Sequence, residues 1–413
     1  DILDNIGRII ITRQDELGKI LAREEGKTLA EAKGEAFRAG QFFQFYAAEA
    51  LRRTGEQNLS TRPNIDVEIV REPIGVTVLI TPWNFPIAIP AWKIAPALAH
   101  GNTVVLKPSE ITPASAYHLT KIMEEAGLPA GVFNLLVAKG EAVGETLVSH
   151  PAVAGISFTG SVPTGRKIAQ GAIQHMKKIQ MEMGGKNPMV IMEDADLDIA
   201  IPVTINGAFY QTGQRCTASS RVIVHEKIYD AFVERFVSEM DKLSVGPALD
   251  PTTQIGPVVS DTQLKSNLSY VEIARSEGCE VVSGQHLAER NTGYFQRPGA
   301  FLNANNKLRS SREEIFGPVA SIIKVDDCEE AVATANDTEF GLSSAICTRS
   351  LYYAREFKRL SEAGMAMVNL PTAGVDYHVP FGGRKNSSYG SREQGRAAID
   401  FYTTTKTTYS FAG

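Results

Sequence analysis

The stretch from Gly155 to Lys186 decides the fold, and it reads GISFTGSVPTGRKIAQGAIQHMKKIQMEMGGK. A strand-like apolar run at 155–158 leads through a glycine-containing turn into a helical pattern at 163–176, and a second strand-like run follows at 179–182. A strand, a helix and another strand in this order are the unit from which parallel sheets are built, with helices covering the sheet faces. The stretch therefore predicts an α/β fold.

The same alternation extends along the chain in both directions from this stretch. Strand-like and helical runs precede it in turn at 75–81, 91–99, 103–107, 115–126, 132–137 and 140–149. A second series starts near Pro188, with strands expected at 189–192, 221–225, 319–325 and 345–348 and helices at 228–243, 260–277 and 328–336. A chain of 413 residues is long enough for two such units and a smaller part.

Two segments outside this alternation have the pattern of exposed strands. Residues 62–71 place apolar side chains at every second position, and residues 397–409 alternate Phe401 with a series of threonines. Period-two alternation is typical of a half-exposed strand. We expect the two segments to form an arm, in which they pair with each other or with a neighbouring subunit. Before the arm, residues 17–53 have the apolar spacing of a helix.

Composition excludes several classes of protein. The 42 Lys and Arg residues against 47 Asp and Glu residues give a net charge of −5, so the chain lacks the basic excess of a nucleic-acid-binding protein. Hydrophobic residues make up 43%, which is too many for a disordered chain, yet no run reaches the roughly 18 apolar residues that span a membrane. Four cysteines are too few for a disulfide framework, which favours the cytoplasm.

The turn from Phe158 to Gly165 is the first candidate site. Glycines between a strand and a helix let the backbone approach a phosphate, and a helix N-terminus attracts anions. The spacing of Gly160 and Gly165 fits an ATP-binding P-loop, but Arg166, Lys167 and Ile168 follow where such a loop needs Lys and a hydroxyl. The turn therefore indicates a dinucleotide site or an ordinary connection between a strand and a helix.

Three further motifs carry residues that could act in catalysis. Cys216 follows Gly213 and Arg215, and a cysteine beside a cation can be a reactive thiolate, although a lone cysteine is more often inert and buried. Glu182 ends an apolar strand in EMGGK, where burial would raise its pKa and make it a usable base; the alternative is a solvated loop acid. Asn84 in TPWNFP could donate to an oxyanion or simply form a turn.

Other kinds of catalytic site find little support. The seven histidines are scattered and no cysteines are paired, so we expect no metal site. The G-x-S-x-G turn of a serine hydrolase is also missing.

Together these motifs resemble the aldehyde dehydrogenase superfamily over essentially the whole chain. The resemblance rests on TPWNFP with Lys93 nine residues after Asn84, on KPSE at 107–110, on FTGS with Gly165, on EMGGK, on GQRC, on EIFGP at 314–318, on Asn369 and on PFGG at 380–383. It implies a Rossmann-type cofactor domain, an α/β catalytic domain and a small β oligomerisation arm.

The resemblance also implies an enzyme mechanism. Cys216 would attack an aldehyde, and Asn84 would hold the oxyanion, with Lys93 as a further catalytic residue. Hydride transfer to NAD would leave a thioester, which Glu182 would hydrolyse through a water. A glutamate at this position favours hydrolysis over transfer to coenzyme A. A non-catalytic scaffold of the same fold is an alternative, but it would be expected to lack Cys216 or Glu182.

Further residues are implied to hold the cofactor and the substrate. The cofactor residues are Thr81, Pro82, Trp83, Lys107, Ser109, Glu110, Phe158, Gly160, Ser161, Gly165, Met183, Gly184, Glu314 and Phe316. Glu110 would repel a 2′-phosphate, which favours NAD, with NADP as the alternative. The substrate residues are Phe85, Trp92, Arg215, Thr217 and Phe381, with the loop 372–378 lining the tunnel.

Within the superfamily, the motifs are most similar to α-ketoglutarate semialdehyde (2,5-dioxopentanoate) dehydrogenases. That substrate ends in a carboxylate, which Arg215 could bind through paired hydrogen bonds. Arg221 is a second candidate, although a structural role suits it better. The alternative is the same chemistry on an uncharged aliphatic or aromatic aldehyde.

We expect three interleaved domains. Residues 1–54 and 74–184 form the dinucleotide-binding domain, 185–388 the catalytic domain, and 55–73 and 389–413 the arm. Because the chain starts with Asp1 inside a helical pattern, we expect that part of the cofactor domain precedes it. The arm implies a homodimer or homotetramer, and the small-molecule aldehyde is the expected partner, without nucleic acid or membrane.

Overall fold

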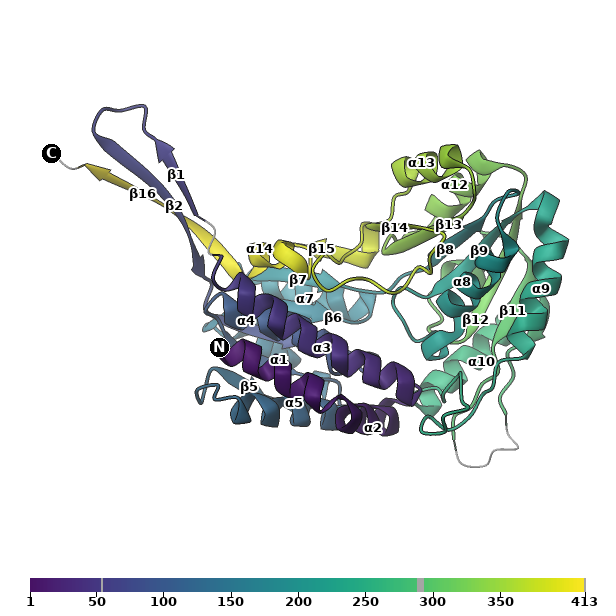
Figure 1. Cartoon of the computed structure of the whole chain (residues 1–413), viewed down its shortest axis with the longest axis horizontal. Coiled ribbons are helices and arrows are strands. Elements are labelled where there is room, and N and C mark those ends of the chain that lie inside the picture. The colour runs from purple at the N-terminus through teal and green to yellow at the C-terminus, as the bar shows by residue number, and fades with distance from the viewer. Residues whose placement is uncertain (53–54, 288–292, 412–413) are drawn as a thin grey trace.

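Figure 1 shows the computed structural model of the chain, in which two α/β parts lie side by side and a β arm projects from one of them. The structure describes residues 1–52, 55–287 and 293–411. The strands of these residues form three sheets. Residues 53–54 and 412–413, which complete two of the expected domain segments, lie outside the described residues.

The first sheet has the strand order β15-β7-β6-β3-β4-β5. Neighbouring strands are parallel except β15, which pairs antiparallel with β7. The bounds are β3 (Val76–Ile80), β4 (Thr103–Lys107), β5 (Phe133–Leu135), β6 (Val153–Thr159), β7 (Lys178–Glu182) and β15 (Ser388–Gly390). From β3 the chain runs outward to β4 and β5, and then returns to β6 on the other side of β3. The carboxyl ends of β3 and β6 therefore meet where the strand order reverses, which is where open α/β sheets bind ligands.

Helices cover both faces of this sheet, as the alternation in the sequence predicts. They are α4 (Ala88–Ala99), α5 (Pro113–Glu125), α6 (Gly140–Ser149) and α7 (Val162–Gln174). The buried side chains of Val78, Ile156 and Ile168 pack between the sheet and α7. On the other face, Leu79, Ile94 and Leu106 belong to a core shared with the N-terminal helices. Burial of both faces explains why these strands are almost continuously apolar.

Three N-terminal helices, α1 (Ile2–Thr12), α2 (Gln14–Glu25) and α3 (Leu29–Glu49), pack along this part of the molecule. The helical pattern expected over 17–53 is broken at 26–28 and ends before 53. Gly26 has φ 101° and ends α2. Thr28 then starts α3 with a capping box, in which Thr28 and Glu31 exchange hydrogen bonds.

The second sheet has the strand order β10-β11-β12-β9-β8-β13-β14. Its strands are β8 (Asn187–Ile191), β9 (Ser219–His225), β10 (Glu280–Ser283), β11 (Gly299–Ala304), β12 (Val319–Val325), β13 (Ser343–Cys347) and β14 (Met365–Val368). Its helices are α8 (Leu197–Phe209), α9 (Tyr229–Asp241), α10 (Asp261–Ser276), α11 (Arg309–Arg312), α12 (Cys328–Asn336) and α13 (Leu351–Leu360). The short link Met183–Lys186 joins β7 of the first sheet to β8 of the second, so the carboxyl end of β7 faces the space between the two parts (Figure 1).

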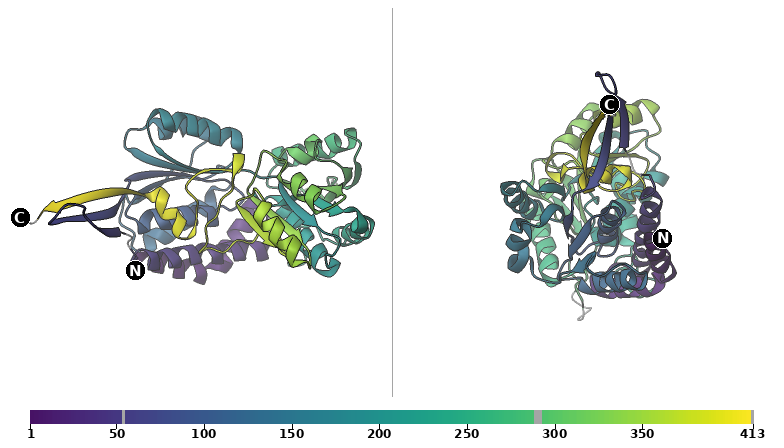
Figure 2. Two further views of the ribbon diagram at one scale, coloured as in Figure 1. Left: turned by 90° about the horizontal axis from the view of Figure 1, so that it is seen from above. Right: turned by 90° about the vertical axis from the view of Figure 1, so that its left-hand side faces the viewer.

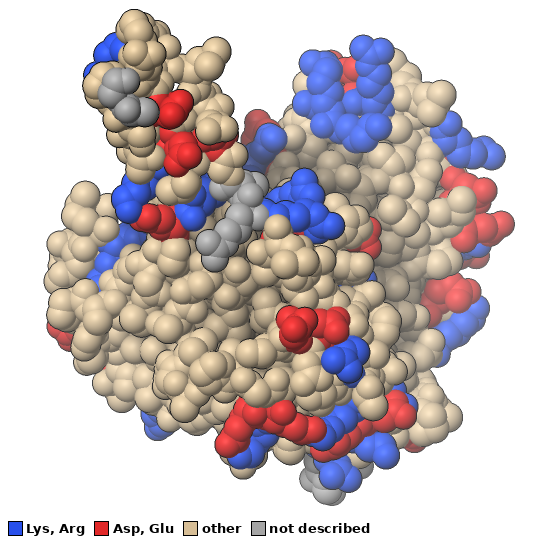
Figure 3. All heavy atoms as spheres, turned by 60° about the vertical axis from the view of Figure 1, so that its left-hand side comes forward, with Lys and Arg blue, Asp and Glu red and all other residues tan. Residues whose placement is uncertain are grey.

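The arm consists of β1 (Gly55–Leu59), β2 (Ile65–Pro73) and β16 (Thr403–Phe411). Figure 2 shows it extending away from both sheets. The two expected strands pair with each other, because β16 runs antiparallel to β2 from Thr403 opposite Pro73 to Phe411 opposite Ile65. The start of the expected strand 397–409 is helical instead, since α14 (Ile399–Tyr402) buries Phe401 and Tyr402 in the first core. Figure 3 shows Lys and Arg mixed with Asp and Glu on the face that includes the arm.

The fold class predicted from the sequence is confirmed, with its two α/β parts and its β arm. The exact domain division stays a prediction. In the part of the chain that the structure describes, no helix is long and apolar enough to cross a membrane.

Candidate active site

A tight turn after α8 presents Cys216. Gln211 and Thr212 have φ of 54° and 59°, and Gly213 has φ 66°, so three successive residues are left-handed. Such backbone is unfavourable for side chains other than glycine and persists only where neighbours hold it. Here the Gln211 N–H donates to Glu31 Oε1 at 2.8 Å and the Thr212 hydroxyl donates to the Gly256 carbonyl at 3.0 Å. These contacts therefore hold the backbone that leads to Cys216 in one conformation.

Cys216 lines a cavity of about 520 Å³ between the two parts of the molecule. The five substrate residues expected from the sequence all lie in its wall: Phe85, Trp92, Arg215, Thr217 and Phe381. The rings of Trp92 and Phe381 lie 5.4 Å apart and make one side aromatic. From the expected tunnel loop, Ala373, Gly374 and Val375 reach the same wall. The structure thus brings Cys216, the expected nucleophile, together with the expected substrate residues.

Asn84 lies beside the nucleophile loop. Its side-chain Nδ2 donates to the Gln214 carbonyl at 3.0 Å, two residues before Cys216. The side chain is almost completely buried, and one amide hydrogen remains after this bond. An amide held this way can donate to an oxygen that develops negative charge near Cys216.

The Cys216 thiol keeps its proton in these surroundings. Burial is the main cause that raises its pKa to about 12, and the charges of Glu314 and Glu182 add to the shift. Backbone N–H groups of Cys216 and Thr217 oppose it. Glu314 and Glu182, both expected site residues, therefore lie close enough to Cys216 for their charges to act on its thiol.

Glu182 is buried at the end of β7. Its Oε2 accepts from the Ser388 hydroxyl at 2.5 Å, and its Oε1 has no hydrogen-bond partner among the described residues. Burial raises the pKa of Glu182 well above its ordinary value, and the charge of Glu393 raises it further. A carboxyl group with a raised pKa and one free oxygen can take a proton from water. Glu182 does not itself line the large cavity in this conformation.

Lys93 is fully buried in α4 and also lies outside the cavity wall. Its Nζ donates to the Ser157 hydroxyl at 2.7 Å and forms an ion pair with Glu393. Its charge lowers the pKa of Glu182, against the effect of Glu393. The structure therefore places Lys93 near Glu182 and outside the wall of the cavity that Cys216 lines.

The EMGGK segment contacts the nucleophile loop through close backbone approaches. A Cβ on Gly185 would lie 2.7 Å from the Cys216 carbonyl oxygen, and one on Gly184 would lie 2.0 Å from Glu314 Oε2. Asn187 donates to the Cys216 carbonyl at 2.8 Å, and the Gly185 N–H donates to Glu314 Oε1 at 2.9 Å. Burial raises the pKa of Glu314 to about 7. A side chain at 185 would therefore collide with the backbone of Cys216, and one at 184 would displace the Glu314 carboxylate.

The carboxyl ends of β3 and β6 offer a cradle that fits a dinucleotide. Thr81 and Thr159 end these neighbouring strands, and both buried hydroxyls lack a partner among the described residues. The N-terminus of α7 follows at Ser161 without a side-chain cap, so its N–H groups are available to an anion. A Cβ on Gly165 would lie 2.5 Å from the sulfur of Met183, so the absence of a side chain at 165 lets this turn pack closely against Met183. Thr159 was not among the residues predicted from the sequence.

The other expected cofactor residues surround the same strand ends. Lys107 ends β4 and pairs with Glu110 at 3.3 Å, and Ser109 lies between them. Trp83 packs edge-on against Phe316 with ring centroids 5.4 Å apart, next to Pro82. Phe158 is buried beneath Gly160 and Gly165.

Arg215 has partners that the sequence did not indicate. Its Nε donates to Gln211 Oε1 at 2.8 Å, its Nη1 donates to Asn206 Oδ1 at 3.2 Å, and its Nη2 lies 3.7 Å from Glu31 Oε1. Glu31 thus offsets part of the positive charge that a substrate carboxylate would meet. Burial is the main cause that lowers the pKa of Arg215. Arg221 lies outside the cavity, where it binds backbone carbonyls of 186, 334 and 335.

Helix α3 contributes residues to the cavity that sequence reasoning missed. The cavity is lined by Glu31, Glu35 and Arg38. Arg38 is more exposed than Arg215, the other arginine of the cavity, because 36% of the Arg38 side chain and 12% of the Arg215 side chain are exposed. Arg38 lies 4.0 Å from Asp376 and over the ring of Tyr377. The capping-box pattern at Thr28 and Glu31 was a visible signal for the start of α3, but nothing local indicated what α3 faces.

Metal ligands were not expected from the sequence. Among the residues that the structure describes, no three His, Cys, Asp or Glu side chains are grouped so that they could hold a metal ion.

Comparison with known proteins gives one family. The profile of the aldehyde dehydrogenase family matches residues 1–408. An α-ketoglutarate semialdehyde dehydrogenase of Haloferax volcanii is 44% identical over 412 residues, which cover 99% of this chain and 85% of the relative. An α-ketoglutaric semialdehyde dehydrogenase of Bacillus subtilis is 44% identical over 97% of this chain and 83% of its own length. The crystal structure of betaine aldehyde dehydrogenase from Staphylococcus aureus in complex with NAD+ has a TM-score of 0.97 at 32% identity, covering 100% of this chain and 82% of that one. The chain therefore belongs to the aldehyde dehydrogenase family.

Proposed function

We propose that the chain oxidises a semialdehyde acid, α-ketoglutarate semialdehyde, to the dicarboxylic acid, with Cys216 as nucleophile, Asn84 as oxyanion donor and Glu182 as general base. The observation that carries this proposal is that Cys216 lines the cavity together with the five expected substrate residues, while Asn84, buried just outside the cavity wall, is anchored to the Gln214 carbonyl two residues before Cys216. The semialdehyde dehydrogenases of Haloferax volcanii and Bacillus subtilis support the substrate.

The residues would act in sequence on a covalently held substrate. The Cys216 thiol gives its proton to solvent, its sulfur bonds to the aldehyde carbon, and the carbonyl oxygen becomes an oxyanion that Asn84 and the Cys216 N–H stabilise. The chemistry that a bound nicotinamide dinucleotide would supply at this point is acceptance of a hydride. Glu182 then takes a proton from water, whose oxygen attacks the thioester; the acid is released, and Glu182 returns its proton to the departing Cys216 thiolate.

NAD is the proposed cofactor, with NADP as the alternative. Thr81, Thr159 and the N-terminus of α7 would hold its pyrophosphate region, and Lys107 and Glu110 its adenosine ribose. The Glu110 carboxylate is half exposed and remains ionised, because hydrogen bonding to backbone and the charge of Lys107 keep its pKa low. A negative charge there opposes a 2′-phosphate.

Two arginines are the proposed ligands of the substrate carboxylate. Arg215 lies next to Cys216, but Glu31, Gln211 and Asn206 share its donors. Arg38 on α3 lies in the same cavity wall. Its guanidinium group is 4.0 Å from the carboxylate of Asp376. Bidentate binding of a carboxylate suits a guanidinium group.

The substrate is tested by measuring kcat/KM over a panel of aldehydes, each with NAD and with NADP. The panel contains α-ketoglutarate semialdehyde, an uncharged aliphatic aldehyde, an uncharged aromatic aldehyde and the cationic betaine aldehyde. We expect the first to be preferred with NAD. Replacing Arg215 or Arg38 by Ala should lower kcat/KM for the anionic substrate about 10- to 100-fold, the value of a charged hydrogen bond, and leave neutral aldehydes nearly unchanged.

Arg235→Ala is the matched control, because Arg235 pairs with Asp198 on the surface and does not line the cavity. If neither Arg215→Ala nor Arg38→Ala changes the ratio of anionic to neutral substrates, carboxylate recognition is wrong. The aromatic wall of Phe85, Trp92 and Phe381 would then favour the second candidate, an uncharged aldehyde.

The rate should depend on pH through Glu182. Because burial and the charge of Glu393 raise its pKa above the ordinary value of a glutamate, the carboxylate forms only as the pH rises, and turnover should increase towards alkaline pH. Glu393→Gln removes the negative charge that raises this pKa, so the acidic limb of the kcat profile should move to lower pH. A limb that stays in place, with enzyme that remains folded, would show that Glu182 does not control it.

The arm is the proposed surface for assembly into a homodimer or homotetramer. It projects from the body, and its exposed apolar side chains include Leu59, Tyr409 and Phe411. Burying such side chains against another subunit would be favourable.

The four cysteines are free thiols, which suits the reducing cytoplasm that we propose as the location.

A further inference from the structure

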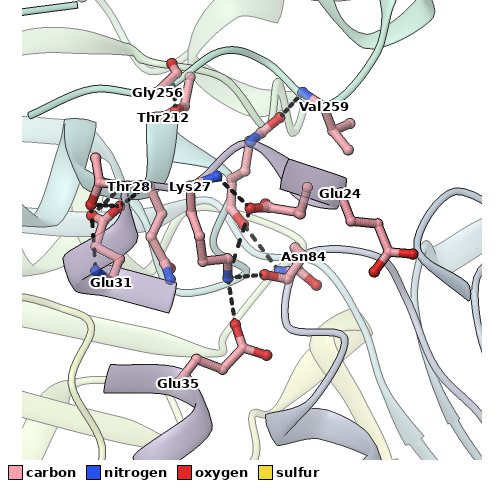
Figure 4. A network of polar contacts seen from close by, with 12 residues as sticks. Glu24, Lys27, Thr28, Glu31, Glu35, Asn84, Thr212, Gly256 and Val259 are labelled. Carbon is pink, nitrogen blue, oxygen red and sulfur yellow. Dashed lines mark hydrogen bonds and ion pairs between the residues drawn. The ribbon is translucent and has the colours of Figure 1, made fainter. Parts of the chain in front are cut away.

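The segment that joins α2 to α3 contacts the loop 81–86, which carries Asn84 and is called the oxyanion loop below. Lys27 is buried completely, and its Nζ donates to the backbone carbonyl of Asn84 at 2.6 Å and to Glu35 Oε2 at 2.6 Å. It also lies 4.2 Å from the centre of the Phe85 ring. Figure 4 shows Lys27 between Glu35 and Asn84, with both contacts made by the same amine. The amine therefore holds Asn84 and its neighbour at once.

Glu35 holds the other end of the same loop. Its Oε1 accepts from the backbone N–H groups of Ile87 and Ala88, at 2.9 Å and 3.0 Å. These groups open α4, which has no side-chain cap of its own. A carboxylate at a helix N-terminus satisfies N–H groups that the helix leaves free and interacts well with its dipole. Glu35 thus supplies from α3 the cap that α4 lacks.

One turn earlier on the same face of α3, Glu31 holds the nucleophile loop. Residues four apart on a helix point the same way. Glu31 Oε1 accepts from the Gln211 N–H at 2.8 Å, within the left-handed turn that leads to Cys216. Glu31 Oε2 is fixed in turn by the Thr28 hydroxyl at 2.9 Å. One rigid helix therefore contacts both loops whose separation sets the oxyanion hole.

We propose that Lys27, Glu31 and Glu35 are positioning residues that set Asn84 against Cys216. The inference rests on the proposed oxyanion role of Asn84. Glu31 and Glu35 also line the cavity wall, but the hydrogen bonds that carry the inference go from the three side chains to two backbone segments, at Asn84–Ala88 and at Gln211. Because misplacement of a catalytic group by about 1 Å can cost 10²-fold in rate, this fixation contributes to kcat.

The test replaces Lys27 and Glu35 together, so that neither is left buried without the other; Glu25, whose Oε2 lies 3.9 Å from the Lys27 amine, is kept in every variant. In Lys27→Met with Glu35→Gln, Met keeps the packing on Phe85, and Gln keeps an oxygen for the N–H groups of α4, while the contact to the Asn84 carbonyl is lost. We expect kcat to fall about 10- to 100-fold while KM for the aldehyde changes less than about threefold. Glu35→Gln alone should have a smaller effect, because Lys27 still reaches the Asn84 carbonyl.

A double-mutant cycle with Asn84→Ala separates positioning from general damage. Asn84→Ala alone should lower kcat about 10²- to 10³-fold, as loss of an oxyanion donor does. If Lys27 and Glu35 act through Asn84, adding their substitutions to Asn84→Ala should cost less than about a further threefold. Equal factors in both backgrounds would overturn the inference, as would an unchanged kcat in the folded Lys27 and Glu35 variant. An unchanged kcat in Asn84→Ala would overturn the oxyanion role itself and the inference with it.

Lys177→Met is the matched control for loss of a largely buried amine. Lys177 lies in the same part of the molecule and donates to the carbonyls of His150 and Val153, at 2.5 Å and 2.7 Å, away from both loops. It should lower the melting temperature and leave kcat within about twofold. A similar fall of kcat in this control would attribute the effect of Lys27 to stability alone and contradict the inference.

Discussion

Cys216→Ala should lower kcat by about 10⁴-fold or more. Without the sulfur, no covalent bond to the aldehyde carbon can form. Removal of the nucleophilic residue from a set of catalytic residues lowers kcat by roughly 10⁴- to 10⁶-fold, even when the other residues stay in place. The measurement is NADH formation under saturating aldehyde and NAD, together with mass spectrometry of the acylated protein. The variant should still bind the cofactor, because the strand ends at Thr81 and Thr159 are unchanged.

Cys328→Ala is the control for this result. Cys328 is a half-buried free thiol at the start of α12 and does not line the cavity. It should keep full activity, and iodoacetamide should still inactivate it by alkylating Cys216. The rate of that alkylation should rise with pH, because burial holds the pKa of Cys216 near 12 and the thiolate fraction grows as the pH approaches it. Aldehyde oxidation retained by Cys216→Ala would exclude the covalent mechanism.

Glu182→Gln should separate the two halves of the reaction. The amide has the same shape and can still accept from the Ser388 hydroxyl, but it cannot take a proton from water. The first turnover should therefore give one NADH per active site as a burst, and steady turnover should then fall about 10²- to 10⁴-fold, the contribution of a general base. Rapid mixing of enzyme, NAD and aldehyde measures both phases.

Ser388→Ala provides the comparison for that experiment. It removes the hydrogen bond that lowers the pKa of Glu182 but leaves the carboxylate, so steady turnover should persist with its acidic limb moved to higher pH. If Glu182→Gln loses the burst as well as the steady rate, Glu182 acts before the thioester forms, and its assignment to deacylation alone is wrong.

Most of the fold follows from local patterns in the sequence. The alternation of apolar strands and amphipathic helices predicted the α/β class because it depends on neighbouring residues only. Helix α8 went unpredicted, since it is apolar nearly all round and contains Pro202. Helix α4 begins at Ala88, three residues before the predicted start, because its cap is Glu35 from another helix. A cap of this kind leaves no local signal.

The same distinction applies to the candidate site. Cys216, Glu182 and Asn84 stand in short loops rich in glycine or proline, and their motifs can be recognised one by one. Lys27, Glu31 and Glu35 instead bind groups between 52 and 180 residues away, and the local sequence shows only a helix start. Among the partners of Arg215, Glu31 was hidden for the same reason, whereas Gln211 and Asn206 lie only four and nine residues away. Contacts between distant segments depend on the assembled fold and cannot be found from spacing.

The return of the chain to the first sheet at β15 has a consequence for how the protein is made. Lys93 emerges from the ribosome early, but Glu393, its ion-pair partner, is synthesised 300 residues later, and β15 covers the edge of β7 only then. Until that point, the nascent first sheet has an open edge and a buried cation without its counter-ion. We therefore expect the first sheet to be completed only at a late stage of translation, since an open strand edge favours aggregation until β15 covers it.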